Sequence, residues 1–373
     1  MSEAIQFLNG RVFDGEHLLE DQALTICDGT VISDIKGEDA TQIDLHGDIL
    51  APGFVDLQVN GGGGINLNDD PCVETLRRMT EAHRALGATT LLPTLITDRP
   101  EKVSVAIEAA CEACADHVPG IAGLHLEGPH LDRAKHGAHD PAMIRPMDAS
   151  DLALLIEAAK RLPCLMVTLA PENATLEQVR KLSDAGVVVM LGHSDCDAVT
   201  ASAYFEAGAR GVTHLFNAMS QMNARAPGLV GAALSHRVWC GLIADGVHVA
   251  PEAMRVALAA NDHIVLVSDA MAVAGTDLPS FMLGERKVYR KNNELRLEDE
   301  TLAGADLDLT RAVSIVMTEC GQSLEQALRR ATSGPASLAG LTGGIGSLRP
   351  GDPFRAVRLR EETGGLRLID VFG

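Results

Sequence analysis

The sequence predicts an α/β fold, a (β/α)8 barrel of the TIM type with a small β-sandwich domain built from both chain ends. Two observations lead to this prediction. Eight apolar runs, mostly alternating with helical stretches, lie within residues 51–340, which matches the strand count of a TIM barrel. Residues 1–50 and 341–373 read instead as short strands joined by turns, so we expect them to form the small domain together.

The runs of the central region have the continuous apolar character of parallel strands buried on both faces. They are VDLQVN (55–60), TTLLPTL (89–95), GIAGLHLEG (120–128), CLMVTLAPE (164–172), VVVMLGHS (187–194), GVTHLFNA (211–218), CGLIADG (240–246) and IVLVSDA (264–270). Stretches rich in Ala, Leu and Glu predict the intervening helices, for example CVETLRRMTEAHRALG (72–87), SDLALLIEAAKRL (150–162), ATLEQVRKLSDAG (174–186), TASAYFEAG (200–208) and PEAMRVALAAN (251–261). A doubly wound sheet is the alternative, but TGGIG (342–346) lies too late for a dinucleotide-binding fingerprint.

The remaining segments have the turn-punctuated pattern of antiparallel strands. Turn residues divide the N-terminal region into AIQFLNGRVF (4–13), QALTICDGTVISDI (22–35) and TQIDLHGDIL (41–50). The tail, GSLRPGDPFRAVRLREETGGLRLIDVFG (346–373), resumes this pattern, so the two ends are expected to pair. After the eighth apolar run, GERKVYRKNNELRLEDETLAG (284–304) predicts a hairpin insertion into the barrel.

Composition limits the partners. A formal net charge of −20 argues against nucleic acid, which requires a basic surface, and an anionic metabolite would need cations concentrated in its pocket. No uncharged apolar run is long enough for a membrane span, and the N-terminus lacks the pattern of a signal peptide, so we expect a cytoplasmic protein. Only Cys111 and Cys114 of the eight cysteines form a C-x-x-C, and without a second pair we expect reduced cysteines on a helix.

Polar groups follow several of the predicted strands, at the barrel end where TIM-barrel enzymes carry their chemistry. They are Gln58 and Asn60 on the first strand, Glu127 on the third, His193 on the fifth, His214 on the sixth, Asp245 and His248 on the seventh, and Asp269 on the eighth. Two imidazoles and one carboxylate make a catalytic zinc shell with a fourth position for water. Because such groups are costly to bury without a purpose, Glu127, His193 and His214 are the predicted metal ligands.

Asp269, in VSDAMAVAG, is the obvious carboxylate on the last strand. It could simply hold a neighbouring loop by accepting backbone hydrogen bonds. The functional alternative, which we favour, is general base toward water at the metal and then general acid toward the leaving group.

The chain resembles a known family through an ordered set of motifs. They are PGFVDLQVNGGGG, LHLEGPHLDRAKHGAHDP, LGHSDCD, THLFNAM, ADGVHV, VSDAMAVAG and TLAGADLDL. In this order they closely resemble the N-acetylglucosamine-6-phosphate deacetylases of the amidohydrolase superfamily. The resemblance implies a homodimer that hydrolyses the N-acetyl group to give glucosamine 6-phosphate and acetate.

The resemblance also implies roles for individual positions. Metal ligation falls on Glu127, His193 and His214, and the catalytic carboxylate on Asp269. Substrate contacts fall on Ala138, His139, Asn217, Ala218, Arg225, His248, Leu302, Ala303 and Gly304. Arg225 is expected to reach the active site of the neighbouring subunit and grip the phosphate there.

The first strand decides the expected number of metals. Relatives with His-x-His at this place can hold two metals, whereas this chain has Gln58 and Asn60. The resemblance therefore implies one divalent metal per subunit, with zinc expected first and iron, cobalt or manganese also compatible. Gln58 is expected to hydrogen-bond a water molecule at the metal. The glycine run that follows, GGGG (61–64), predicts either a turn or a close approach of the sugar.

Two other functions stay open from the sequence. One is deacetylation of the epimer, N-acetylgalactosamine 6-phosphate, or hydrolysis of a related amide. The other is a non-catalytic homologue that binds a sugar phosphate, which Asp269 beside a complete metal shell argues against.

Overall fold

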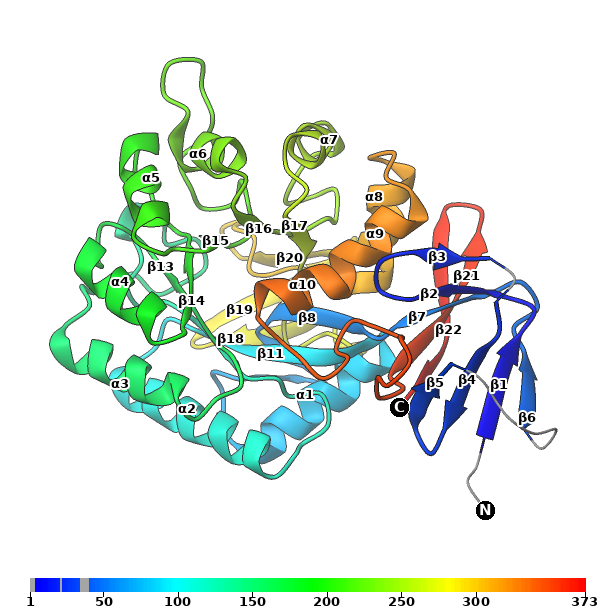
Figure 1. The fold of residues 1–373 in the computed structure, drawn as a ribbon. Coiled ribbons are helices and arrows are strands. Elements are labelled where there is room, and N and C mark those ends of the chain that lie inside the picture. The colour runs from blue at the N-terminus through cyan, green and yellow to red at the C-terminus, as the bar shows by residue number, and fades with distance from the viewer. Residues whose placement is uncertain (1–3, 21, 34–39) are drawn as a thin grey trace.

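The computed structural model describes residues 4–20, 22–33 and 40–373, and its centre is an eight-stranded parallel sheet curled into a barrel (Figure 1). The strands in sheet order are β17 (Ile264–Leu266), β16 (Trp239–Leu242), β15 (Gly211–Val212), β14 (Val188–Leu191), β13 (Leu165–Leu169), β12 (Leu124–Glu127), β11 (Ala88–Ile96) and β8 (Phe54–Val59). Each lies within one of the eight predicted apolar runs or overlaps it. The predicted barrel is therefore confirmed in its strand number and direction.

The barrel closes between β17 and β8 through short-range contacts beyond the end of β17. The Asp269 amide donates to the Gln58 carbonyl at 3.0 Å, and the Asn60 amide donates to the Ala270 carbonyl at 2.8 Å. A parallel bridge joins Val59 to Ala270. The contacts that close the barrel therefore involve Gln58, Asn60 and Asp269, which also carry polar groups at the strand ends.

Helices surround the barrel between the strands, as the alternating pattern predicts (Figure 1). They are α1 (Val73–Ala85), α2 (Pro100–Ala115), α3 (Ala149–Ala159), α4 (Leu176–Asp184), α5 (Ala198–Glu206), α6 (Gly228–His236), α7 (Pro251–Ala260), α8 (Leu309–Thr318), α9 (Leu324–Ala331) and α10 (Ser333–Leu338). Local chemistry fixes several starts: Asp148, Thr175 and Ser323 each form a capping box that satisfies the first backbone amides. No helix in the described ranges is both long and apolar enough to cross a membrane.

The two chain ends meet in a pair of small sheets beside the barrel (Figure 1). One contains β5 (Thr30–Ile32), β4 (Leu24–Cys27), β1 (Ala4–Leu8) and β6 (Thr41–Asp44). The other contains β22 (Gly365–Phe372), β21 (Ala356–Glu362), β7 (Ile49–Pro52), β2 (Arg11–Phe13) and β3 (Leu18–Leu19). The rings of Phe7, Phe354 and Phe372 pack together, with centroids 5.4–5.7 Å apart. The predicted pairing of the two ends is confirmed.

The boundary between the two parts is less sharp than its prediction. Strand β7 crosses the expected boundary at residues 50 and 51, and it pairs with β21 in the small domain. The last residues of the predicted run 22–35 lie outside the described part of the chain. The division into 1–50 plus 341–373 and 51–340 therefore stays a prediction.

The predicted insertion after the eighth strand forms a three-stranded antiparallel sheet near the barrel opening. Its strands are β18 (Ser280–Leu283), β19 (Arg286–Lys291) and β20 (Glu294–Leu297). Buried Val288 and Leu295 pack with Met271 and Val273 in a separate apolar cluster. This cluster attaches the insertion to the loop that follows β17.

The glycine run at 61–64 packs against α1 and neighbouring loops of the same chain. It forms β9 (Gly61–Gly62) and the turn leading to β10 (Ile65–Asn66). A Cβ on Gly62 would lie 2.9 Å from the His83 ring, so glycine permits the approach of α1. Because none of the four glycines lines the cavity at the barrel opening, their close approach is to α1 and neighbouring loops.

Candidate metal and catalytic site

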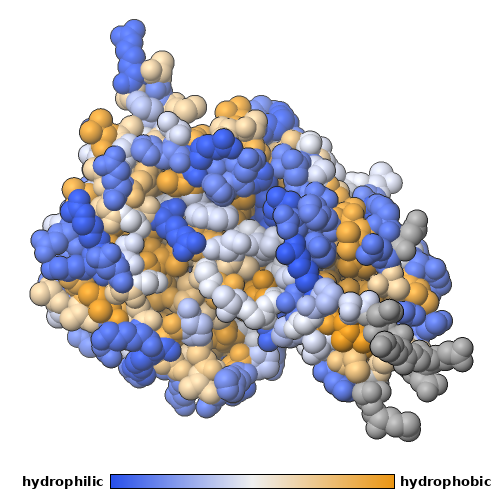
Figure 2. Space-filling view, viewed as in Figure 1, coloured by the Kyte–Doolittle hydropathy of each residue, from blue (hydrophilic) through white to orange (hydrophobic). Residues whose placement is uncertain are grey.

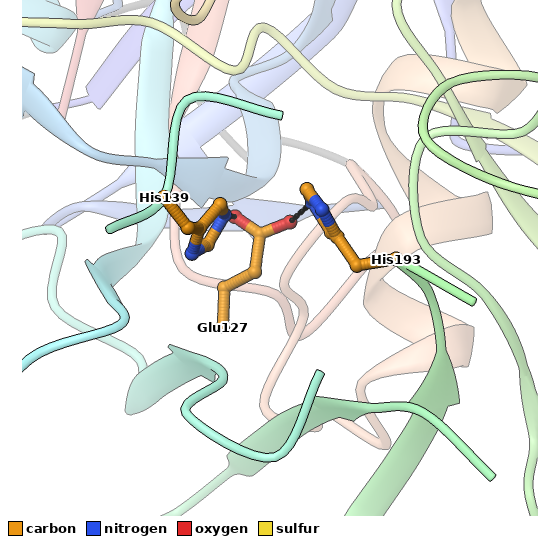
Figure 3. Close-up of side chains that lie close together, drawn as sticks. All are labelled: Glu127, His139 and His193. Carbon is orange, nitrogen blue, oxygen red and sulfur yellow. Dashed lines mark hydrogen bonds and ion pairs between the residues drawn. The ribbon is translucent and has the colours of Figure 1, made fainter. Parts of the chain in front are cut away.

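Four buried side chains converge at the C-terminal end of the barrel strands. Glu127 is the last residue of β12, and His193 and His214 each lie two residues beyond the end of β14 and β15. Both Nε2 atoms approach Glu127 Oε1, at 3.2 Å from His193 and 2.9 Å from His214, and they lie 3.0 Å from each other. His139 approaches from the other side, with Nε2 3.9 Å from Glu127 Oε2. Figure 3 shows Glu127 between His139 and His193.

The backbone at these strand ends adopts a conformation that L-residues rarely take. His193, His214 and Asp269 have φ angles of 48°, 33° and 51°. A residue with positive φ is held there only where the surrounding structure outweighs the strain, and such residues cluster at functional sites. The positive φ therefore marks His193, His214 and Asp269 as candidates for a functional site.

The tautomer of His193 and the ionised state of Glu127 favour the binding of a cation. His193 Nδ1 donates to the Lys135 carbonyl at 2.7 Å, which leaves the Nε2 lone pair facing Glu127 and His214. Burial alone would raise the pKa of Glu127, but its interactions with the His193 and His214 rings lower it well below its usual range. Two ring nitrogens and a carboxylate held ionised in a buried site are the donor set that a catalytic zinc site uses. Glu127, His139 and His193 also have ligand atoms within 4.8 Å of one another.

His139 is held as a neutral hydrogen-bond donor. The Thr97 amide donates to its Nδ1 at 3.3 Å, and the Thr97 hydroxyl lies 2.8 Å from the same atom. Since Nδ1 accepts, the proton of the neutral ring is on Nε2, which faces the cavity. Burial, with the nearby His193, lowers the pKa of His139 to about 3, so the ring carries no charge at neutral pH.

Asp269 lines the same cavity as the imidazoles and is oriented by side-chain amides at the first strand. Its Oδ1 accepts from Asn60 Nδ2 at 2.6 Å and from Gln58 Nε2 at 3.1 Å. Neither bond involves Oδ2, so that oxygen could accept a proton. Burial, with the charge of Glu127, raises the pKa of Asp269 to about 6. The carboxylate can thus both accept and return a proton near neutral pH.

Gln58 connects the two carboxylates. Its Nε2 lies 3.3 Å and 3.4 Å from the two oxygens of Glu127 and also reaches Asp269. An amide N–H is a donor and cannot ligate a metal, so the first strand supplies orientation here.

A cavity of about 380 Å³ opens above these residues. It is lined by most of the predicted substrate contacts together with the convergent residues: Ala138, His139, Asn217, Ala218, His248, Leu302, Ala303, Gly304, Glu127, His193, His214, Asn60 and Asp269. Asp245 orients His248 through a 2.7 Å bond to Nδ1. A Cβ on Gly304 would lie 2.4 Å from Met271, so only glycine fits this part of the lining.

Arg225 does not line the cavity of its own chain. Residues 221–227 are all exposed, and Figure 1 shows the loop before α6 projecting away from the barrel. Figure 2 shows hydrophilic atoms at the outer end of this loop. The structure therefore separates Arg225 from the other predicted substrate contacts.

The sequence alone did not identify three residues of the site. Thr97, which sets the His139 tautomer, belongs to none of the recognised motifs, and the strand before it, β11, carries no charged group. Arg296 and Glu300 line the cavity from the insertion, which read only as a hairpin. Alternation within β20 could have indicated Arg296, since it lies between the buried Leu295 and Leu297.

This geometry has counterparts among known proteins. The Amidohydrolase family matches residues 49–360, a stretch that contains the whole barrel. The chain belongs to the amidohydrolase family. Among relatives of this amidohydrolase, the N-acetylgalactosamine-6-phosphate deacetylase of Shewanella sp. (strain ANA-3) is 42% identical over 88% of this chain and 85% of its own length. The N-acetylglucosamine-6-phosphate deacetylase of Haemophilus influenzae is 35% identical, over 83% and 82%.

Solved structures agree with the fold of this amidohydrolase. The N-acetylglucosamine-6-phosphate deacetylase of Pasteurella multocida matches it with a TM-score of 0.92 at 32% identity, covering 97% of both chains. An Asp-to-Ala mutant of the Mycobacterium smegmatis enzyme, in complex with N-acetyl-D-glucosamine 6-phosphate, matches with a TM-score of 0.89 at 28% identity, covering 99% and 97%. Within its family, the chain groups with the amino-sugar 6-phosphate deacetylases, so it is a hydrolase. The family is metal-dependent, and the buried Glu/His cluster could hold the ion.

Proposed function

We propose that the chain hydrolyses the N-acetyl group of N-acetyl-D-glucosamine 6-phosphate to D-glucosamine 6-phosphate and acetate. The observation that carries this proposal is that Asp269 lines the same cavity, of about 380 Å³, as the Glu127, His193 and His214 cluster. Named relatives with this reaction span most of the chain. Acetate release from purified, metal-loaded protein is the direct test. Tight binding of the sugar phosphate without acetate release would favour a non-catalytic binding protein instead.

The chain's own residues account for the steps of this hydrolysis. Glu127, His193 and His214 would hold a divalent metal, which when bound would supply Lewis acidity and lower the pKa of water there. Asp269 Oδ2 takes the proton from the attacking water and then delivers it to the departing amine. The His139 Nε2 proton donates to the oxyanion that forms at the acetyl carbonyl. Because Nε2 of His139 carries that proton, His214 is the better third ligand.

The galactosamine epimer is the second candidate substrate. The relative of 42% identity is an N-acetylgalactosamine-6-phosphate deacetylase, and so is a relative from Escherichia coli O157:H7 with 34% identity. The epimers differ only in the orientation of one ring hydroxyl, which none of the residues discussed above distinguishes. Measuring kcat/KM for both sugar phosphates in parallel decides between them, and a higher value for the galactosamine epimer would replace the main proposal.

We expect one divalent metal per chain, with zinc first and iron, cobalt or manganese compatible. The reason is that Gln58 and Asn60 donate hydrogen bonds to Asp269 where two imidazoles would be needed for a second metal. Elemental analysis of active protein should give one equivalent. Two equivalents, both required for turnover, would contradict the single-metal proposal. A matched variant, Gln58→His with Asn60→His, should gain capacity for a second metal.

Arg225 is proposed to complete the phosphate site of the neighbouring subunit in a homodimer, which we expect to be cytoplasmic. The support is its position on an exposed loop outside its own cavity. Arg225→Ala should lower kcat/KM for the phosphorylated sugar by roughly 10- to 150-fold, the worth of a charged hydrogen bond, and hardly change the unphosphorylated sugar. Arg180→Ala, at an exposed position of α4, is the control. Equal losses on both sugars would mean that Arg225 supports the loop or the dimer and does not bind phosphate.

A further inference from the structure

Asp56 is a buried carboxyl group that the proposed mechanism does not use. It lies on β8 two residues before Gln58, so the two side chains lie on the same side of the strand. Asp56 is 1% exposed, and its Oδ2 has no hydrogen-bond partner among the described residues. An unpaired buried carboxyl oxygen costs free energy that an apolar side chain would avoid. Stability of the fold alone therefore does not explain an aspartate at this position.

The other oxygen of Asp56 joins the two strands between which the barrel closes. Oδ1 accepts from the Gln58 amide and from the Ser268 amide, each at 3.2 Å. Strands β8 and β17 are the two ends of the sheet order, and an isolated bridge between Val59 and Ala270 connects the segments at their C-terminal ends. The Asp56 side chain therefore links the strands where an isolated bridge takes the place of a continuous ladder.

This link ends directly beside the proposed base. Ser268 precedes Asp269, whose φ of 51° is held only where the surrounding structure outweighs the strain. The Ser268 hydroxyl accepts from the Ala270 amide at 3.2 Å, and the Asp269 amide donates to the Gln58 carbonyl at 3.0 Å. The Gln58 side chain in turn donates to Asp269 Oδ1 at 3.1 Å. One oxygen of Asp56 thus holds the backbone beside both partners of that bond.

We propose that Asp56 is a positioning residue, which holds the backbone at Gln58 and Ser268 so that the Asp269 carboxylate keeps its place in the site. This proposal rests on the proposed function for the role of Asp269 as the base. Placement matters because a displacement of about 1 Å can cost roughly 100-fold in rate. Burial raises the pKa of Asp56 to about 7, so the neutral acid, which has the shape and the Oδ1 acceptor of asparagine, is present near neutral pH.

Two substitutions at this position separate the hydrogen-bonded link from the charge. Asp56→Asn keeps an Oδ1 acceptor for both amides, whereas Asp56→Ala removes it. In the metal-loaded protein we expect Asp56→Ala to lower kcat for acetate release by roughly 100-fold. KM should change little, because Asp56 does not line the cavity, and metal content should stay the same. Asp56→Asn should restore kcat to near the wild-type value.

Asn261→Ala is the control for a merely structural role. Asn261 is also buried, at 0% exposed, and it accepts from the His263 amide at 2.9 Å and donates to the Val238 carbonyl at 2.7 Å. It therefore supports β17 from the end that lies away from the site. Asn261→Ala should lower the thermal unfolding temperature and keep kcat. If Asp56→Ala leaves a cavity that unfolds the protein, Asp56→Val fills the space and still removes the acceptor.

Other outcomes overturn the proposal. An unchanged kcat in Asp56→Ala would remove the positioning role, and an Asp56→Asn variant as slow as Asp56→Ala would assign the effect to the acid itself. Equal losses of kcat in Asn261→Ala would show that Asp56 acts only through the stability of the barrel.

Crystal structures of the variants test the positioning without turnover. The bond from Gln58 Nε2 to Asp269 Oδ1, 3.1 Å in the wild type, should be lost in Asp56→Ala and kept in Asp56→Asn. An intact bond in Asp56→Ala would contradict the proposal. If the wild-type protein releases no acetate, the proposed function fails, and these structures still decide whether Asp56 positions Asp269.

Discussion

His214→Ala is expected to lose the metal and turnover together. Its Nε2 lies within 3.0 Å of both Glu127 Oε1 and His193 Nε2, so the substitution removes one of the three proposed metal ligands. Loss of a group that only supports a metal ligand costs roughly 10- to 100-fold in metal affinity or activity, and loss of a ligand should cost more. Metal content by elemental analysis and acetate release, measured on the same sample, check the result. His193→Ala should behave in the same way.

The control for these variants must match the backbone as well as the side chain. Both histidines adopt positive φ, where alanine is disfavoured, so some loss of stability is expected from the backbone alone. His117 also has a positive φ, 53°, and lies exposed beyond α2. His117→Ala should therefore keep metal and activity while reporting the backbone cost through thermal unfolding. If His214→Ala binds metal normally and folds like the control, His139 becomes the third ligand instead.

The barrel could be predicted from the sequence because its strands are buried on both faces. Each appears as a continuous apolar run, and the helices between them carry the spacing of one buried face. The sequence was less informative about strands that pair with segments far away along the chain. Strand β7 pairs with β21, more than 300 residues away, and no local feature shows that the small domain extends past residue 50.

Some features of the candidate site could likewise be predicted from the sequence, and others could not. Glu127, His193, His214 and Asp269 could be predicted because burying a charged or titratable group directly after an apolar strand is costly unless the group binds or reacts there. The sequence could not show that Oδ1 of Asp269 accepts two amides, since that contact joins segments about 210 positions apart. The sequence could not show the tautomer of His139 either, because the Thr97 amide that fixes it lies 42 positions away.

Asp269→Asn is expected to keep the metal and the fold while losing most turnover. Asparagine tolerates the left-handed backbone at this position, where φ is 51°, and its carbonyl oxygen can still accept from Asn60 and Gln58. The amide cannot take a proton from water, and general acid–base catalysis contributes roughly 100- to 10,000-fold. Acetate release should fall by that order, with metal content and binding of glucosamine 6-phosphate unchanged. Near-normal kcat would transfer the proton-transfer role to another group, His139 first.

The pH dependence of the wild-type protein tests the same carboxylate. Burial and the charge of Glu127 raise the pKa of Asp269 to about 6, and a bound cation would lower it again. Because the base must be ionised, kcat/KM should fall as pH drops through an apparent pKa at or below about 6. Asn60→Ala removes a hydrogen bond that lowers this pKa, so its acidic limb should move to higher pH. An acidic limb that stays in place in Asn60→Ala and persists in the residual activity of Asp269→Asn would assign the titration to a different residue.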